Sequence, residues 1–399
     1  MSRIGFQNFL KLQPLREAKT AEASEKMPEM DFFPNRLAAL RHPSRQFVTV
    51  SRVEALTGDM NLYTLIPDAE KGQMQLAPFE PGQYISARFE IGETRCSRPY
   101  SLCGSPSGNV YQIAVKAIPD GLCSVYARDH WTVGTRLEIS APEGTFVFQP
   151  LRDEKHILAI AGGSGITPFV SMAMDIAGRN DGRTMTVLYG CRIPRDRAFG
   201  DVLDALCSGS DGRLRTVYVF SEESRPGQRS GFIDESVIRE SLQEHSSVFV
   251  SGPRKMIESV RGALQKIGLE RKYIRMEVPG EAGRLETYPD APGEVPEKVT
   301  LTVRMQGKVY TVRADPQATI LRSLENAGIA VVSGCRSGVC GFCRSSLRSG
   351  NVFAPNQKEH EREADILYNQ IHLCETYPLT DLELDVTGYP SGKEGKQDG

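Results

Sequence analysis

The sequence predicts a multidomain chain of mixed α+β and α/β architecture, with an antiparallel β-barrel, a parallel-sheet domain and a smaller C-terminal domain. Three changes of pattern predict these parts. Residues 45–150 hold short alternating runs separated by turn signals, and residues 151–278 alternate apolar strand-like runs with helix-length segments. Residues 298–387 form a third compact stretch that begins and ends with strand-like runs.

Composition limits the class of protein. The chain has 399 residues, which suggests two or three domains, and 40% of them are hydrophobic. The chain has 48 basic and 50 acidic residues, so it has no strong positive electrostatic field that would attract nucleic acid or an anionic membrane. No apolar run reaches the roughly 20 residues that span a bilayer, and no basic-then-apolar signal pattern opens the chain. We therefore expect a cytoplasmic protein without a membrane or nucleic-acid partner.

The barrel is predicted from β-rich runs at the spacing typical of small antiparallel barrels. These runs are Phe47–Val53, Leu62–Ile66, Tyr84–Phe89, Val110–Val115 and Leu137–Ser140. The parallel sheet is predicted from apolar runs that alternate with helical segments, as in βαβ units. These are the runs Ile157–Ala161, Thr186–Tyr189, Thr216–Phe220 and Val248–Val250, with helices over Phe169–Ala177 and Met256–Ile267.

Three stretches fall outside the predicted domains. Residues 1–44 mix polar and apolar side chains, and we expect an extension with one or two short helices that packs on the body, rather than a partner-binding arm. Residues 279–297 are rich in Pro, Gly and acidic residues and are predicted as a linker. Residues 388–399 have the composition of a disordered tail.

Four of the nine cysteines are clustered near the C-terminal end. The segment from Cys335 through Cys340 to Cys343 has the spacing C-x4-C-x2-C, and Cys374 follows later. This is the plant-type 2Fe-2S spacing, in which four thiolates converge on two irons. Interspersed glycines leave backbone N–H groups free to point at sulfur. Structural zinc is the alternative, but such sites usually carry two C-x2-C knuckles and this segment has one.

The other five cysteines, at 96, 103, 123, 191 and 207, are scattered among apolar neighbours. Stable disulfides are disfavoured in a reducing compartment, so these residues are predicted to be small buried side chains.

Two motifs in the barrel region fit a flavin. In Arg98-Pro99-Tyr100-Ser101 an arginine can pair with a phosphate, an aromatic ring can lie along the flavin, and a hydroxyl can reach its N5 edge. In isolation this tetrapeptide would be an ordinary strand. Gly121-Leu122-Cys123-Ser124 opens a short helical segment and is a candidate phosphate seat, although such a segment alone is also a helix cap. A second clamp on a pyrophosphate favours FAD, with FMN as the alternative.

A glycine-rich loop follows the first apolar run of the parallel-sheet region. Its residues are Gly162, Gly163, Ser164, Gly165, Ile166, Thr167 and Pro168. Glycines permit a tight strand-to-helix turn and close approach of a pyrophosphate, which the helix N-terminus attracts. The loop is neither a P-loop, because no Gly-Lys-Ser/Thr follows, nor the G-x-G-x-x-G fingerprint, because Pro168 takes the place of the last glycine.

On these motifs, residues 46–278 resemble the ferredoxin–NADP reductase superfamily, and residues 298–387 resemble a plant-type ferredoxin domain of β-grasp fold. Together they are similar to oxygenase reductases of the phthalate dioxygenase reductase type. The resemblance implies flavin contacts in the barrel region and nucleotide contacts in the parallel-sheet region. The flavin contacts are Arg98, Pro99, Tyr100, Ser101, Gly121, Ser124 and the backbone of Val115 and Lys116.

The same resemblance places pyridine-nucleotide contacts at the glycine-rich loop, namely Gly162, Gly163, Gly165, Ile166, Thr167 and Pro168, and at Cys191, Arg192, Gly252, Pro253 and Met256. Ser251 stands where the family usually has a cysteine beside the nicotinamide, a departure that could change the rate of hydride transfer. Glu277 occupies a strand end where many relatives carry an acid near the flavin, and a solvated surface charge is the alternative.

The nucleotide donor is predicted to be NADH, with NADPH as the alternative. Arg192, Arg195 and Arg197 could receive a 2′-phosphate, whereas Asp196 would repel one and could bond a ribose hydroxyl. Relatives with a C-terminal ferredoxin mostly use NADH.

The order of the motifs predicts an NAD(P)H-dependent electron-transfer enzyme. A nicotinamide gives a pair of electrons to the flavin, which passes them singly to the 2Fe-2S cluster and on to an acceptor protein. Ser101, Ser251 and Glu277 are the candidate catalytic residues. The resemblance implies an oxygenase or hydroxylase as acceptor. The alternatives are another redox partner, such as a hybrid-cluster or metallocofactor enzyme, and a non-catalytic redox-sensing or electron-transfer subunit.

Overall fold

The computed structural model describes most of the chain, namely residues 3–22, 32–92, 94–119, 121–223, 226, 228–277, 282–355 and 363–387. The predicted tail at 388–399 lies outside the described residues. The chain divides into two compact units, Met1–Pro43 and Ser44–Gly399. Among the described residues no helix combines the length and the apolar character that crossing a bilayer requires.

The first unit holds two helices, α1 (Arg3–Glu22) and α2 (Phe33–Arg41). The sequence predicts one or two short helices here, and α1, at 20 residues, is longer than expected. Pro34 stands in the first turn of α2, where its missing N–H leaves no helical hydrogen bond unmade.

The second unit begins with a six-stranded antiparallel sheet in the order β4-β3-β6-β1-β2-β5. Its strands are β1 (Gln46–Thr57), β2 (Met60–Pro67), β3 (Tyr84–Ile91), β4 (Thr94–Ser101), β5 (Tyr111–Lys116) and β6 (Arg136–Ile139). Buried and half-buried residues alternate at the start of β1, as in a strand with one face in a core. Leu102, after β4, bridges to Ile113 in β5, so the two edges meet. The predicted antiparallel barrel is confirmed.

One end of this barrel is covered by helix α3 (Leu122–His130) and the tryptophan that follows it. The ring of Trp131 lies edge-on to Tyr63, with centroids 5.4 Å apart, and the Tyr63 hydroxyl donates to the carbonyl of Ala127 at 3.0 Å. These contacts fix α3, which the second flavin motif opens, against strand β2.

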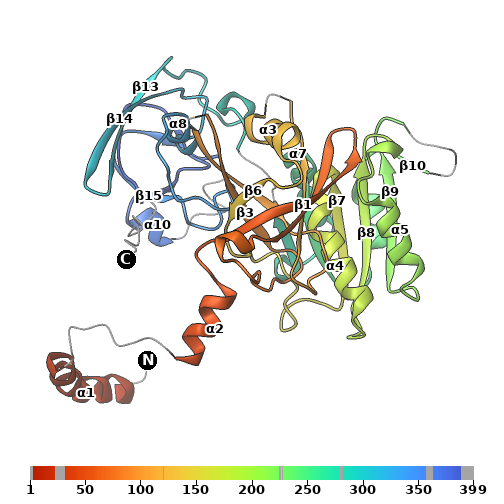
Figure 1. Cartoon of the computed structure of the whole chain (residues 1–399), viewed down its shortest axis with the longest axis horizontal. Helices are drawn as coiled ribbons and strands as arrows, with labels where there is room; N and C mark the ends of the chain where they lie inside the picture. The colour runs from red at the N-terminus through yellow and green to blue at the C-terminus, as the bar shows by residue number, and fades with distance from the viewer. Residues whose placement is uncertain are drawn as a thin grey trace. The chain divides into compact units, whose positions relative to one another are not determined.

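The next part is a parallel sheet in the order β10-β9-β8-β7-β11-β12. Its strands are β7 (His156–Gly162), β8 (Thr184–Cys191), β9 (Leu214–Phe220), β10 (Arg229–Ser230), β11 (Ser246–Ser251) and β12 (Ile274–Glu277). β7 is buried along its whole length, because helices cover both faces of the sheet. The helices are α4 (Thr167–Gly178), α5 (Gly200–Ser208), α6 (Glu235–Ser241) and α7 (Arg254–Ile267), and Figure 1 shows α4 and α5 on one face. The predicted parallel sheet is confirmed.

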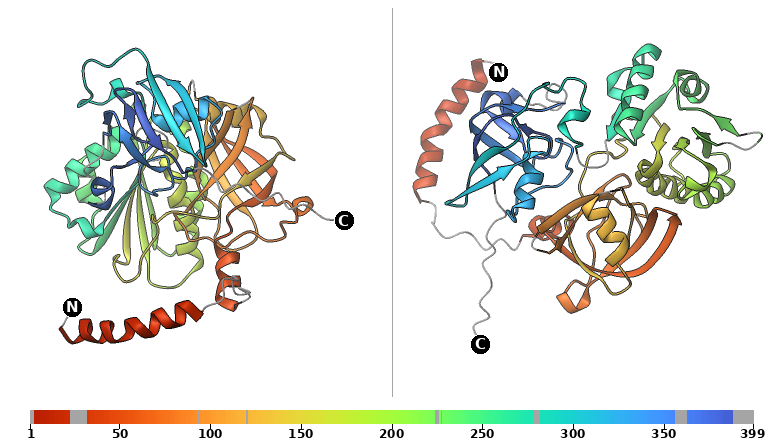
Figure 2. Two further views of the ribbon diagram at one scale, coloured as in Figure 1. Left: turned by 90° about the vertical axis from the view of Figure 1, so that its left-hand side faces the viewer. Right: turned by 90° about the horizontal axis from the view of Figure 1, so that it is seen from above.

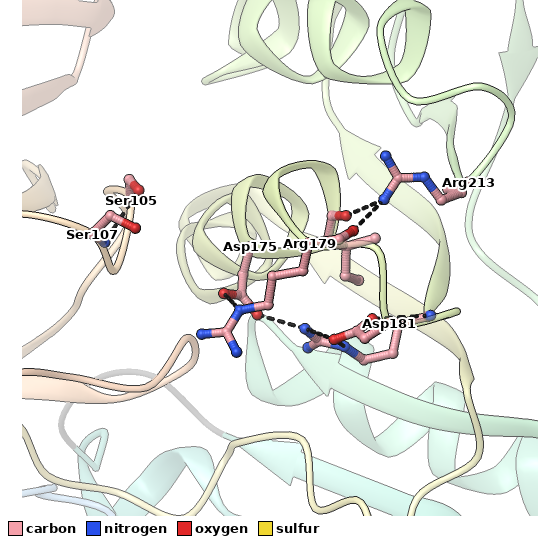
Figure 3. A network of polar contacts seen from close by, with 8 residues as sticks. Ser105, Ser107, Asp175, Arg179, Asp181 and Arg213 are labelled. Atoms are coloured by element: carbon pink, nitrogen blue, oxygen red, sulfur yellow. Dashed lines mark hydrogen bonds and ion pairs between the residues drawn. The ribbon is translucent and has the colours of Figure 1, made fainter.

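A network of charges holds the C-terminal end of α4 (Figure 3). The buried carboxylate of Asp175 accepts hydrogen bonds of 2.7 Å from both Arg179 and Arg183. Arg213, from the loop before β9, donates to the carbonyl of Arg179 at 2.7 Å. Cations at this end satisfy the last carbonyls of the helix and favour its dipole. The network therefore fixes α4, whose opposite end begins at the glycine-rich loop.

The third part is a mixed five-stranded sheet in the order β14-β13-β19-β15-β17. Its strands are β13 (Val299–Met305), β14 (Lys308–Ala314), β15 (Arg344–Ser349), β17 (Gln370–His372) and β19 (Leu382–Asp385), with helix α8 (Ile320–Asn326). β13 runs parallel to β19 and antiparallel to β14, and Leu321 and Leu324 of α8 fill the core beneath them. This is the β-grasp arrangement that the sequence predicts. A short helix, α10 (Glu363–Leu367), and a two-stranded ribbon of β16 (Val352–Phe353) and β18 (Tyr377–Pro378) complete this part.

The described part of the predicted linker, residues 282–297, packs on this third part. Leu285 is 1% exposed, and the ring of Tyr288 lies edge-on to Tyr377 at 5.8 Å between centroids. The Tyr377 hydroxyl also donates to the carbonyl of Gly283. The segment therefore belongs to a small apolar cluster of its own. Figure 2 shows the barrel in orange, the parallel sheet in yellow to green and the third part in blue.

Candidate functional site

The glycine-rich loop lies at the point where the order of the parallel sheet reverses. β7 is the first strand in sequence, and later strands are added on both of its sides, with β8 on one and β11 on the other. In open α/β sheets ligands bind in the crevice beyond the carboxyl ends of strands at such a point. The loop forms a 3-10 turn (Gly163–Ile166) between β7 and α4, anchored by the buried side chain of Ile166.

Sterics explain the glycines in this loop. A Cβ at Gly165 would lie 2.1 Å from the carbonyl oxygen of Ser251, and one at Gly162 would lie 2.6 Å from Sδ of Met256. A Cβ at Gly252 would lie 3.0 Å from the amide nitrogen of Gly162. The two predicted nucleotide motifs, one after β7 and one after β11, are therefore in direct contact.

One side of the loop is open. Gly163 has a φ of 53°, in the left-handed region, and no atom lies within 4 Å of the position that its Cβ would take. Thr167 and Pro168 form the first turn of α4, and the Thr167 hydroxyl donates to the carbonyl of Ser164 at 3.0 Å. The buried hydroxyl of Ser251 has no hydrogen-bond partner among the described residues. Open space at a helix N-terminus fits a pyrophosphate.

Cys191 and Arg192 lie at the carboxyl end of β8. Burial raises the pKa of Cys191 to about 12, so it is a neutral thiol. The Arg192 side chain is 60% exposed and pairs with Asp196 at 3.0 Å. Arg197 pairs with Asp204 at 2.7 Å, while Arg195 is exposed. Two of the three arginines that could receive a 2′-phosphate are thus held by carboxylates.

The first flavin motif occupies the end of β4. The ring of Tyr100 lies edge-on to Trp131 at 6.1 Å between centroids, and burial raises its pKa above the usual range. Ser101 and Pro99 pair in register with Tyr84 and Ser86 of β3. These contacts place the motif on the barrel wall.

The side chain of Arg98 is mostly buried. Its Nη1 donates to the carbonyl of Ser97 at 2.9 Å and lies 3.5 Å from Oε2 of Glu325, in α8 of the third part. The side chain of Arg98 is 16% exposed. Sequence reasoning did not indicate this long-range partner.

The second flavin motif opens α3. Ser124 accepts a hydrogen bond from the amide of Ile118 at 3.1 Å and donates to the carbonyl of Gly121 at 3.3 Å, so it closes the preceding turn. The N-cap residue Gly121 offers no side-chain cap to the first N–H groups, which leaves them for an anion. Val115 and Lys116 end β5, a strand that contacts the 3-10 turn of the glycine-rich loop.

The four clustered cysteines form two pairs. The amides of Cys335 and Cys340 donate to each other's sulfur at 3.4 and 3.3 Å, and the neighbouring thiol of Cys374 lowers the pKa of Cys343. Within each pair one pKa is lowered by the neighbouring thiol, to about 5 for Cys335. Backbone amides also point at sulfur: those of Ser337 and Gly338 reach Cys335 and Cys374 at 3.4 and 3.3 Å.

The surroundings of the cysteine sulfur atoms bear on the kind of metal site. The backbone amides of Cys335, Ser337, Gly338 and Cys340 all donate to cysteine sulfur. Such donors stabilise the negative charge of an iron–sulfur cluster, so the residues present fit a 2Fe-2S cluster held by the four cysteines.

The cysteine loop meets both other parts of the second unit. A Cβ at Gly334 would lie 3.2 Å from Oε2 of Glu143, from the barrel, and 3.3 Å from Sγ of Cys340. Burial raises the pKa of Glu277, at the end of β12, to about 8, and the nearby Cys335 thiolate adds to the shift. Burial likewise raises the pKa of Glu143 to about 7. Oε2 of Glu277 is buried without a hydrogen-bond partner in the described chain, which disfavours the alternative of a solvated surface charge.

Three family models match consecutive stretches of the chain. They describe an oxidoreductase FAD-binding domain over residues 47–148, an oxidoreductase NAD-binding domain over 159–262 and a 2Fe-2S iron-sulfur cluster binding domain over 303–379. The chain is also 30% identical over 312 residues to the "3-ketosteroid-9-alpha-monooxygenase, ferredoxin reductase component" of Mycobacterium tuberculosis, covering 76% of this chain and 84% of that protein.

The chain belongs to the ferredoxin–NADP reductase superfamily with a C-terminal 2Fe-2S domain. It is 25% identical to the "Glycine betaine monooxygenase reductase subunit" of Chromohalobacter salexigens, over 77% of this chain and 86% of that protein. The fold matches a phthalate dioxygenase reductase structure with a TM-score of 0.64 at 24% identity, covering 86% of this chain and 98% of that one.

This member of the superfamily is an oxidoreductase that uses FAD, NADH and a 2Fe-2S cluster to carry electrons to a protein acceptor. Sequence reasoning missed Tyr84, Glu143, Glu325 and Arg336, which lie around the cysteine loop. Arg336 stands inside the cysteine motif, but nothing in the motif signals its buried partner, and the other three residues stand in no candidate site motif.

Proposed function

We propose that the chain is the reductase component of a multicomponent oxygenase. The observation that carries this proposal is the meeting of three elements: the cysteine loop lies against Glu143 of the barrel and Glu277 of the parallel sheet. A flavin beside these residues would stand between the nucleotide and the cluster. The relatives whose names include oxygenase or monooxygenase reductase components support an oxygenase as the acceptor.

The residues of each motif are proposed to act as follows. Arg98, Pro99, Tyr100, Gly121 and Ser124 hold the flavin and its phosphates, and Ser101 donates a hydrogen bond at flavin N5. Val115 and Lys116 present backbone to the flavin at the side of the glycine-rich loop. When bound, the flavin takes electrons in pairs from the nicotinamide and the cluster carries them onward singly.

The nucleotide is proposed to bind where the two motifs of the parallel sheet interlock. Gly162, Gly163, Gly165, Ile166, Thr167 and Pro168 seat its pyrophosphate at the start of α4. Cys191 and Arg192 line the adenosine side. Gly252, Pro253 and Met256 shape the nicotinamide side, where the unpartnered hydroxyl of Ser251 supplies a hydrogen bond. The pKa of Glu277 is about 8, so its carboxyl is neutral at lower pH and adds no negative charge where the cysteine loop meets the parallel sheet.

Cys335, Cys340, Cys343 and Cys374 are proposed as the residues that would hold the cluster, in line with the backbone amides directed at sulfur in their loop. We propose domain limits of 45–150 for the flavin barrel, 151–278 for the nucleotide domain and 298–387 for the ferredoxin domain. The three sheets, which span residues 46–139, 156–277 and 299–385, support these limits. A cytoplasmic location and the absence of nucleic-acid partners stay predictions.

An anaerobic titration of the purified chain with NADH, followed by visible and EPR spectroscopy, tests the internal electron path. We expect flavin bleaching together with a reduced 2Fe-2S signal, and weaker reduction by NADPH. A colourless, zinc-containing chain would overturn the proposal.

The acceptor is tested separately, with the oxygenase component that copurifies with the chain. Substrate oxidation should require NADH, the reductase and that component together. Negligible NADH-driven reduction of cytochrome c by the isolated chain would instead favour a non-catalytic subunit. An acceptor that does not activate oxygen would identify a different redox partner.

A further inference from the structure

A single buried carboxylate links the flavin motif to the cysteine loop. Glu325, in the last turn of α8, is 6% exposed. Its Oε1 accepts a hydrogen bond from Nη2 of Arg336, and its Oε2 lies 3.5 Å from Nη1 of Arg98. Arg98 belongs to the barrel and Arg336 to the cysteine loop, so the three charges join two parts of the chain.

The position of Glu325 is unfavourable by local criteria. A carboxylate in the last turn of a helix opposes the helix dipole, and a buried charge is costly unless it is paired. Helix α8 already has a side-chain cap at its other end, where Thr319 accepts a hydrogen bond from the amide of Arg322. Formation of α8 therefore does not require Glu325, and its two guanidinium partners account for its burial.

Arg336 lies directly after the predicted ligand Cys335. Its side chain is 0% exposed, and its φ of 56° is in the left-handed region, which a residue other than glycine seldom adopts. The ion pair with Glu325 offsets the burial of this guanidinium. The carboxylate thus acts directly on the backbone turn that carries Cys335.

Arg98 completes the link from the other side. It is the residue of the flavin motif proposed to contact phosphate, and it stands on β4, which contacts α8. Two guanidiniums and one carboxylate carry a net charge of +1, and a flavin phosphate on the Arg98 side would compensate it. Arginine presents several N–H donors in a planar fork, so it can bind a phosphate and Glu325 together.

We propose that Glu325 is a positioning residue that holds the ferredoxin domain against the flavin barrel, with its carboxylate clamped between Arg98 and Arg336. The clamp fixes the distance between flavin and cluster and so governs the step between them, while leaving the nucleotide-to-flavin step unchanged. This proposal rests on the proposed function, because it concerns the electron path inside the chain.

The test compares Glu325→Gln with the wild-type holoenzyme in anaerobic rapid mixing with NADH. Flavin bleaching should proceed at the wild-type rate within about twofold, because the ion-pair partners of Glu325 belong to the barrel and the cysteine loop and not to the parallel sheet. Reduction of the cluster, followed by freeze-quench EPR, should slow by about tenfold, a size that coupling between contacting charged residues reaches. Glu383→Gln is the matched control, since Glu383 pairs with Arg304 on the surface of the same domain, both about half exposed, and should leave both rates unchanged.

Hydrogen–deuterium exchange of the resting holoenzymes separates positioning from general destabilisation. In Glu325→Gln the amides of α8 and β4 should exchange faster, while those of β13 and β14, in the domain core, should not change. Faster exchange throughout residues 298–387 would instead indicate a merely structural role and overturn the proposal.

Glu325→Asp is a second test variant, which is used if Glu325→Gln does not assemble its cluster. The shorter carboxylate keeps the charge but reaches both guanidiniums less well, so cluster reduction should be slowed to an intermediate rate. A wild-type rate of cluster reduction in the cluster-loaded variants overturns the proposal. Absence of flavin bleaching in the wild type and the Glu383→Gln control refutes the proposed function itself, a distinguishable result.

Discussion

Two glycine-containing loops of this chain use the same residue type for different reasons. In the loop after β7 a Cβ at Gly165 would collide with the backbone of Ser251, at 2.1 Å. In the cysteine loop Gly338 has a φ of 74°, in the left-handed region, and its amide donates to the sulfur of Cys374 at 3.3 Å. Close packing also acts in the cysteine loop, where a Cβ at Gly338 would collide with the carboxylate of Glu375. What distinguishes the cysteine loop is that its backbone donors are directed at sulfur.

The two loops should therefore lose their functions in different ways. A loop that depends on close contact fails when it is enlarged, and its failure spreads to the sheet that it joins. A loop that depends on ligand direction fails when a sulfur or a donor is removed, while the surrounding fold persists.

Replacement of a cysteine should have the largest effect. Cys335→Ser removes one thiolate of the pair with Cys340 and is expected to abolish the 2Fe-2S EPR signal. Flavin bleaching by NADH should stay within about twofold of wild type, because the two sites lie on separate sheets. Iron analysis and anaerobic spectra check both results. Loss of flavin together with iron would show that the cysteine loop supports the whole unit.

The second largest effect is expected from a larger side chain in the glycine-rich loop after β7. Gly165→Ala places a methyl group against the carbonyl of Ser251 and should lower the free energy of unfolding by about 1–3 kcal/mol, as overpacking does. NADH should bleach the flavin more slowly, and the cluster signal should be retained. Gly262→Ala, in α7 with no atom within 4 Å of the new Cβ, is the control and should gain about 0.5–1 kcal/mol. Urea unfolding measures both, and equal stability of the two variants would contradict the steric explanation.

A pH-dependent effect is expected at the junction of the two loops. Burial raises the pKa of Glu277 to about 8, so the folded chain holds this proton more tightly than the unfolded chain, in which the carboxyl has its ordinary pKa of 4.5. The contribution of Glu277 to stability therefore falls as pH rises from about 4.5 to 8. Glu277→Gln cannot lose a proton, so its melting temperature should fall less between pH 6 and pH 8 than that of the wild type. An equal fall in the melting temperature of the wild type and Glu277→Gln over this pH range would show that this carboxyl is not buried.

The smallest effect concerns the nucleotide donor. Asp196→Asn releases the exposed Arg192 from its ion pair, which lets its guanidinium meet a 2′-phosphate. KM for NADPH should fall about two- to fivefold, the size of an exposed charge interaction. KM for NADH should change little. Steady-state reduction of cytochrome c with each nucleotide measures the two values, and an equal change in both would place Asp196 away from the ribose.

Local patterns predicted much of this molecule. The strand at Ile157–Ala161, the glycine-rich turn and the helix after it are confirmed, because a buried parallel strand is continuously apolar and its turn needs small residues. The four clustered cysteines were found by spacing alone, and the structure brings them together in two pairs. Of the five other cysteines, predicted to be buried, four are buried and Cys207 is half-buried.

The features of the site that the sequence did not predict depend on packing between residues far apart in the chain. Glu325 and Arg98 are 227 positions apart, and neither has a neighbour in sequence that signals the other. Glu143 forms an isolated β-bridge with Tyr84 after β6, and only the folded chain brings it to Gly334. The burial of Leu285 and Tyr288 in the linker was also not predicted, because apolar residues scattered among proline and glycine show no periodicity.

The central claim is that electrons pass from NADH to the 2Fe-2S cluster within one chain. The direct measurement is the rate of cluster reduction after rapid mixing with excess NADH, at enzyme concentrations that span a hundredfold range. We predict a first-order rate that does not change with enzyme concentration. A rate that rises in proportion to enzyme concentration would show transfer between molecules and contradict the claim.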